Sequence, residues 1–85
     1  MYYVYIIQSI NFPEQIYVGC TQDFAKRLSN HNCGTTAHTQ KYMPWKLVTY
    51  SVFEDKEIAY RYEEYLKSGS GRAFAKKRFW GIANF

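Results

Sequence analysis

Along the chain, three runs of tyrosine-rich, apolar and β-branched residues alternate with polar segments. Residues 2–8 form the first run, residues 16–20 repeat its character after a polar stretch, and residues 45–53 form the third. We therefore predict three strands, the first two joined as a β-hairpin. Every second side chain of a strand lies on one face, so the hairpin can place Tyr5 and Tyr17 on a common face.

Helical periodicity follows the hairpin. Thr21 is the predicted N-cap, with Asp23 in the first turn of a helix that continues to about His31. Arg27 and His31, four residues apart, then lie together along the edge of its apolar stripe. The polar residues 32–44 are predicted to form a loop.

Two further helices are predicted after the third strand. Asp55 caps the first, which runs from about Lys56 to Lys67, with Glu63 at the border of its apolar stripe. The residues expected to face inward are Ile58, Ala59, Tyr62 and Leu66. Ser68-Gly69-Ser70-Gly71 should break the chain, and Ser70 should cap the last helix. The predicted order β-β-α-β-α-α indicates an α/β (α+β) fold.

Length and composition favour one domain over residues 1–85. A hydrophobic fraction of 47% and an aromatic fraction of 20% can supply one core without disulfides or structural metals. Cys20 and Cys33 are too few for a disulfide scaffold and are expected to be reduced thiols. The apolar run after Met1 lacks signal-peptide features and is too short for a membrane span. We expect a cytoplasmic protein with no membrane partner.

Positive charge is concentrated near the C-terminus, and this bears on the partners of the protein. The formal net charge is +4, and five of the eleven basic residues lie in one stretch without an acidic residue: Lys67, Arg72, Lys76, Lys77 and Arg78. Such a cluster is typical of a surface that binds a phosphate backbone. A solvated helix face is the alternative interpretation.

A sparse set of polar residues could hydrolyse a phosphodiester. That reaction needs a carboxylate for a divalent metal, a cation for the charge growing at phosphorus, and a group that takes a proton from water. Glu63, Arg27 and the pair Tyr5 and Tyr17 supply these types. The tyrosines could instead be packing residues, Arg27 could cover an apolar helix edge with its stem, and Glu63 could form an exposed pair with Lys67.

Five ordered blocks resemble the GIY-YIG nuclease superfamily, and the small stand-alone bacterial members in particular. The first two motifs are similar to Tyr3-Val4-Tyr5 and Tyr17-Val18-Gly19, about ten residues apart. The remaining similar blocks are Asp23-Phe24-Ala25-Lys26-Arg27-Leu28 with His31-Asn32, Tyr42-Met43-Pro44-Trp45-Lys46-Leu47-Val48, and Glu63-Glu64-Tyr65-Leu66-Lys67-Ser68-Gly69. Each tripeptide alone is a weak signal, but the ordered set is specific.

The resemblance implies a three-stranded antiparallel sheet flanked by helices and metal-dependent hydrolysis of DNA in one step. Glu63 would bind Mg²⁺, with Mn²⁺ as a possible substitute, and Arg27 would stabilise the phosphate as charge develops. Tyr5 and Tyr17 would lie beside the attacking water, one of them as general base, without an indication of which. His31 would orient a tyrosine or contact phosphate, and Lys67, four residues after Glu63, would be a phosphate neighbour.

Two positions depart from the family pattern. Tyr3 replaces the glycine of the first motif, a change expected to be tolerated in a strand. The asparagine that many family nucleases carry about a dozen residues after the glutamate is absent from Phe74-Ala75-Lys76, and the next asparagine is Asn84. A nucleic-acid-binding module without catalysis is therefore the main alternative, and a protein-interaction domain the second.

The family resemblance leaves the substrate structure open. Family members take specificity from attached domains, so this chain is expected to show weak or structure-based selectivity for DNA. We expect no small-molecule cofactor and a monomer or weak homodimer.

Overall fold

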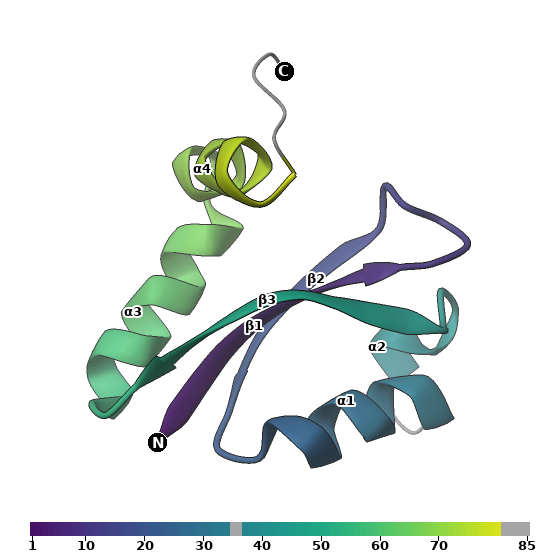
Figure 1. Ribbon diagram of the computed structural model, residues 1–85, viewed down its shortest axis with the longest axis horizontal. Coiled ribbons are helices and arrows are strands. Elements are labelled where there is room, and N and C mark those ends of the chain that lie inside the picture. Colours follow the sequence, from purple (N-terminus) through teal and green to yellow (C-terminus); the bar gives the residue numbers. More distant parts are fainter. Residues whose placement is uncertain (35–36, 81–85) are drawn as a thin grey trace.

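The computed structural model describes residues 1–34 and 37–80, and in this part of the chain a three-stranded sheet carries the fold. Strand β1 (Tyr2–Ser9) lies between β2 (Ile16–Thr21) and β3 (Trp45–Phe53), and it is antiparallel to both. Figure 1 shows the three strands as one twisted layer. The predicted antiparallel sheet is confirmed.

Helices cover both faces of the sheet. Helices α1 (Phe24–Cys33) and α2 (Ala37–Gln40) lie on one face, and α3 (Lys56–Lys67) and α4 (Gly69–Phe79) on the other (Figure 1). Apart from the single-turn α2, the order β-β-α-β-α-α is as predicted. None of the described helices is both long and apolar enough to cross a lipid bilayer.

Alternate residues of β1 supply the two cores. Val4 and Ile6 pack on one face with three buried residues from the last two helices: Ala59, Leu66 and Ala75. Tyr5 and Ile7 pack on the other face with Trp45. Because β1 is central and covered on both faces, it is buried along most of its length.

Helix α1 begins and ends later than predicted. Asp23, not Thr21, is its N-cap: the Asp23 carboxylate accepts a hydrogen bond from the Lys26 amide at 3.1 Å, whereas Thr21 ends β2. A side-chain oxygen of the N-cap residue that accepts from the third helical amide is the ordinary capping geometry. At its other end α1 passes His31 and stops at Gly34, whose φ of 76° lies in the left-handed region.

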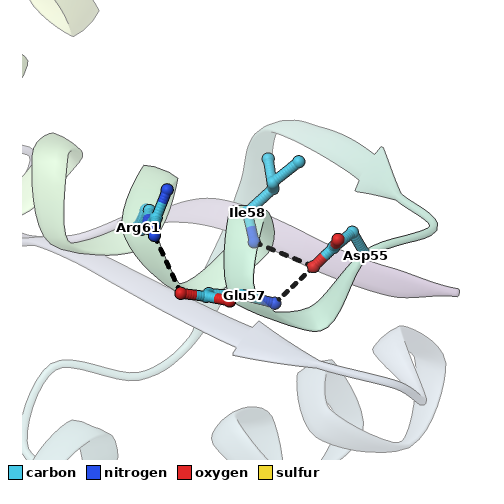
Figure 2. Close-up of polar contacts among 4 residues, drawn as sticks. All are labelled: Asp55, Glu57, Ile58 and Arg61. Carbon is cyan, nitrogen blue, oxygen red and sulfur yellow. Dashed lines mark hydrogen bonds and ion pairs between the residues drawn. The ribbon is translucent and has the colours of Figure 1, made fainter.

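The start of α3 matches the prediction. Figure 2 shows the Asp55 carboxylate accepting hydrogen bonds from the amides of Glu57 and Ile58, at 2.8 and 3.3 Å, and an ion pair between Arg61 and Glu57. The prediction that Ile58 faces inward is wrong, because its side chain is 50% exposed. The apolar stripe of α3 is therefore narrower than the periodicity suggested, with Ala59 and Leu66 at its centre.

The break between α3 and α4 is shorter than predicted. Ser68, not Ser70, caps α4 by accepting a hydrogen bond from the Gly71 amide at 3.1 Å. One residue thus separates the helices, and the chain must turn sharply there. Gly71 permits this turn, since a Cβ at this position would overlap the backbone of Tyr65.

Candidate active site

The two motif tyrosines lie side by side on the hairpin. Tyr5 pairs with Gly19 across the ladder and Ile7 pairs with Tyr17, so both tyrosine side chains lie on one face. Their ring centroids are 6.3 Å apart. The predicted common face is confirmed. Gly19 makes it possible: a Cβ there would overlap the Tyr5 ring and hydroxyl.

A buried hydrogen-bond relay begins at Tyr5. Its hydroxyl lies 3.0 Å from Nε2 of His31, and Nδ1 of His31 lies 2.7 Å from the Thr39 hydroxyl. All three residues are at most 1% exposed. The Arg27 guanidinium, which can only donate, also acts on the Tyr5 hydroxyl oxygen. We assign the Tyr5 hydroxyl as the donor to Nε2, which makes Nδ1 the protonated nitrogen that donates to Thr39.

Burial sets the protonation states of this relay. Burial, then the neighbouring Tyr17, raises the pKa of Tyr5, and the charge and hydrogen bond of Arg27 oppose that rise only in part. Burial and the positive charge of Arg27 lower the pKa of His31. Both groups are consequently neutral at pH 7, which agrees with a phenol that donates to an imidazole.

Arg27 and Glu63 come from helices on opposite faces of the sheet, and both charges act on Cys20 in the edge strand β2. Arg27 lies on α1, one turn before His31, and Glu63 lies on α3. Burial raises the pKa of the Cys20 thiol on β2; the Glu63 charge adds to the rise and the Arg27 charge opposes it. Glu63 also acts on Tyr5. Ring and hydrogen-bond contacts therefore join Tyr5, Tyr17 and His31, and the charges of Arg27 and Glu63 both act on Tyr5.

The Glu63 carboxylate is the metal-binding candidate. Its side chain is 16% exposed, and one oxygen lies 3.6 Å from Nζ of Lys67. Within residues 1–34 and 37–80, three or more histidine, cysteine or acidic side chains do not gather into a metal cluster. Mg²⁺ typically uses one or two carboxylates, with substrate phosphates and water completing its shell, so a single glutamate at a substrate site suits it.

Part of the basic stretch lines a groove beside Tyr17. The groove has a volume of about 550 Å³, and Lys67, Arg72 and Lys76 line it with Tyr17 and Trp80. Glu14 lies there too, so the walls are not uniformly cationic. Of the five predicted nucleic-acid-binding residues, these three basic residues line the groove and the other two do not. Lys77 and Arg78 are exposed but absent from this lining, and the Arg78 guanidinium lies 6.0 Å from the centroid of the Phe74 ring.

Sequence reasoning missed two residues that hold the relay in place. Thr39 lies in α2, in the segment predicted to be a loop, and its carbonyl accepts a hydrogen bond from the Trp45 indole at 2.9 Å. Asn32 holds the backbone of Trp45 at both its amide and its carbonyl, at 2.6 and 3.2 Å. Neither residue belongs to a periodic pattern. The only sequence signal was Asn32 within the His31-Asn32 block.

The two departures from the family pattern have structural counterparts. Tyr3 lies in β1 with its ring centroid 5.9 Å from that of Tyr50, so the strand accepts it. Ala75, a dozen residues after Glu63, is 6% exposed and belongs to the core. Asn84 lies outside the described residues.

Comparisons with known proteins agree with this arrangement. The family model of the GIY-YIG catalytic domain matches residues 1–78. UPF0213 proteins of Streptococcus pyogenes serotypes M3 and M1 are 35% identical to the chain over 72 residues, which cover 84% of the chain and 76% of each relative. GIY-YIG domains are nuclease domains that generally use divalent metal ions. The family match, the relatives and the confirmed fold together show that the chain belongs to the GIY-YIG family.

Proposed function

We propose that this chain is a metal-dependent endonuclease that hydrolyses phosphodiester bonds in DNA with weak or structure-based selectivity. The observation that carries the proposal is the convergence of Tyr5, Tyr17, Arg27, His31 and Glu63 at the β2 edge, although they come from two strands and from helices on opposite faces. A sheet edge that joins a carboxylate, a guanidinium and two phenols has the parts that phosphodiester hydrolysis needs.

Tyr17 is the general base of this proposal. Tyr5 is completely buried, its pKa is raised, and its hydroxyl donates to His31, so it is poorly placed to take a proton from water. Tyr17 is half-buried and lines the groove. As its phenolate, Tyr17 accepts the proton of the attacking water. The water oxygen bonds to phosphorus while the bond to the leaving oxygen breaks, and the leaving oxygen takes a proton from solvent. Tyr5 and His31 position Tyr17: the Tyr17 ring lies 4.9 Å from His31, centroid to centroid.

Arg27 and Glu63 have different electrostatic roles in this proposal. The Arg27 guanidinium donates to the phosphate oxygens as negative charge grows at phosphorus. Glu63 would hold a divalent metal, Mg²⁺ or Mn²⁺, which when bound would neutralise phosphate charge and activate water. Lys67, 3.6 Å from Glu63, offers a further positive charge where the groove begins.

A cleavage assay tests the proposal. Purified wild-type protein is incubated with labelled single-stranded, duplex, flap and branched DNA and RNA in Mg²⁺, Mn²⁺ or EDTA. We expect cleavage that requires metal and disappears in Glu63→Gln, Arg27→Ala and Tyr17→Phe. Glu64→Gln is the matched control, because Glu64 is the exposed neighbour of Glu63. Full activity in a folded Glu63→Gln protein would refute the mechanism.

A nucleic-acid-binding module without catalysis is the second candidate, and one observation favours it. The helix position where many family nucleases carry an asparagine belongs here to Ala75, which lines the groove but has no side-chain amide to offer there. This alternative predicts binding that weakens steeply with salt and no cleavage in Mg²⁺ or Mn²⁺. Metal-dependent turnover that is lost in Glu63→Gln would exclude it.

A further inference from the structure

One face of α3 carries a line of polar residues past the β2 edge. Lys56, Tyr60, Glu63 and Lys67 follow each other at spacings of four, three and four residues, which keeps them on the same side of a helix. Glu63 thus has Lys67 on one side and the pair Lys56 and Tyr60 on the other. The groove described above begins at the Lys67 end.

A second hollow lies at the other end of this line. It has a volume of about 330 Å³ and is lined by residues from β2, α1 and α3, among them Cys20, Arg27, Lys56 and Tyr60. Arg27 lines this pocket and Tyr17 lines the groove. The two hollows therefore flank the candidate active site, one on each side.

The charges of the second pocket favour an anion. Lys56 is exposed, and its ammonium lies 5.8 Å from the centroid of the Tyr60 ring, which is itself 44% exposed. Arg27 adds a second positive charge. Asp23 also lines the pocket, where its carboxylate caps α1 by accepting from the Lys26 amide, so Lys56, Arg27 and Asp23 together leave a net positive charge.

The acidic neighbours of Lys56 on its own helix are engaged elsewhere. Asp55 accepts the amides at the start of α3, and Glu57 forms an ion pair with Arg61 at 2.8 Å. An aromatic ring beside an ammonium at a cationic pocket is the combination that proteins use to follow a nucleic-acid strand.

We propose that this pocket binds a backbone phosphate of the same nucleic-acid strand, on the opposite side of the scissile phosphate from the groove. Lys56 is its charged ligand, and Tyr60 presents its ring and hydroxyl to the adjoining nucleotide. The inference rests on the proposed function, because it extends the path of the substrate on either side of Glu63. The strand would then run along α3, from Lys56 past Glu63 to Lys67.

The helix geometry fixes the scale of this path. At a rise of about 1.5 Å per residue, Lys56 lies about 10 Å from Glu63 along the helix, and Lys67 about 6 Å in the other direction. With about 3.4 Å per nucleotide of a duplex strand, these offsets correspond to roughly three and two nucleotides. Lys56 and Lys67 should therefore contact different phosphates.

Binding measurements compare Lys56→Ala and Tyr60→Leu with a matched control. Lys46→Ala removes one exposed lysine from β3, at the opposite edge of the sheet from β2. Affinity for fluorescein-labelled DNA is measured in EDTA over a series of salt concentrations. We expect Lys56→Ala to reduce the slope of log affinity against log salt by about 0.7 to 0.9, the value for one lost phosphate contact, and Lys46→Ala to leave the slope unchanged. Tyr60→Leu should weaken binding without changing the slope.

Methylphosphonate substitution locates the contact. Each phosphate in turn is replaced by a neutral one, and the bond cut by the wild-type protein in Mg²⁺ gives the reference position. We expect one methylphosphonate that weakens binding of the wild-type protein but not of Lys56→Ala. A second methylphosphonate, on the opposite side of the cut, should weaken binding of the wild-type protein but not of Lys67→Ala. The inference is wrong if Lys56→Ala matches Lys46→Ala, or if both positions fall on one side, while the wild-type protein still binds and cuts. Failure of the wild-type protein to bind DNA or RNA at low salt would overturn the proposed function as well.

Discussion

Gly19→Ala should damage both stability and activity through a single contact. A Cβ at position 19 would overlap the Tyr5 ring and hydroxyl, because Tyr5 lies directly opposite Gly19 in the ladder. The ring cannot turn away at low cost: its hydroxyl is hydrogen-bonded to His31 at 3.0 Å, and its edge packs on Phe24, with ring centroids 5.8 Å apart. Either the two strands separate locally or Tyr5 leaves the relay.

Two contributions set the magnitude. Forcing an extra methyl group into a packed core typically costs about 1 to 3 kcal/mol. Breaking the hydrogen bond between Tyr5 and His31 leaves a buried polar group without its partner, at about 1 to 3 kcal/mol. We expect Gly19→Ala to lower the free energy of unfolding by roughly 2 to 4 kcal/mol, since relieving the overlap sacrifices part of the hydrogen bond. A displacement of about 1 Å near Tyr17 should reduce cleavage by about 100-fold.

Urea denaturation and the cleavage assay test this reasoning together. Gly69→Ala is the matched control, because a Cβ there meets no atom within 4 Å. Tyr5→Phe removes the hydroxyl from the overlap, so the double variant Gly19→Ala with Tyr5→Phe should be more stable than the sum of the single effects predicts. Additive effects, or a Gly19→Ala protein as stable and active as Gly69→Ala, would refute the account of why this motif ends in glycine.

Three further predictions follow from the relay and the helix caps. Thr39→Val should cost about 1 to 3 kcal/mol by leaving Nδ1 of His31 without an acceptor, and Thr39→Ser should restore most of it in urea denaturation. Because the pKa of His31 is lowered, the free energy of unfolding should fall as the pH drops below about 6.5; because that of Tyr5 is raised, it should fall again above about pH 10. His31→Gln should flatten the acid limb and Tyr5→Phe the alkaline limb; unchanged limbs would contradict the protonation states. Asp55→Ala should cost about 1 kcal/mol, and Arg61→Ala clearly less, because its ion pair is exposed; thermal melts that rank them in the opposite order would contradict this.

The elements that sequence predicted correctly are those in which a local pattern and tertiary burial agree. The three strands follow from their β-branched and aromatic runs, and α3 from its Asp55 cap and apolar positions. Helix α2 could not be predicted, because its four residues have no periodicity of their own. They are fixed by two contacts of Thr39 with residues outside the helix, one to His31 and one to Trp45. The predicted cap of α4 was wrong because Ser68 and Ser70 are the same residue type and could equally cap a helix. Only the packing of Gly71 on α3 decides which of the two serines is the N-cap.

A second limit of prediction from the sequence concerns residues that are far apart in the chain but close in space. The periodicity put Arg27 at the edge of one helix and Glu63 at the border of another, yet nothing local says that these helices lie on opposite faces of the sheet. Two such residues can approach only at an edge of the sheet. Here β2 is that edge, since β1 is covered on both sides and β3 lies at the other end. Gly19 lets Tyr5 lean toward β2, and the short Cys20 lies where both charges act on it. A bulkier side chain at Gly19 should therefore separate the groups that the two helices bring together, even with both helices intact.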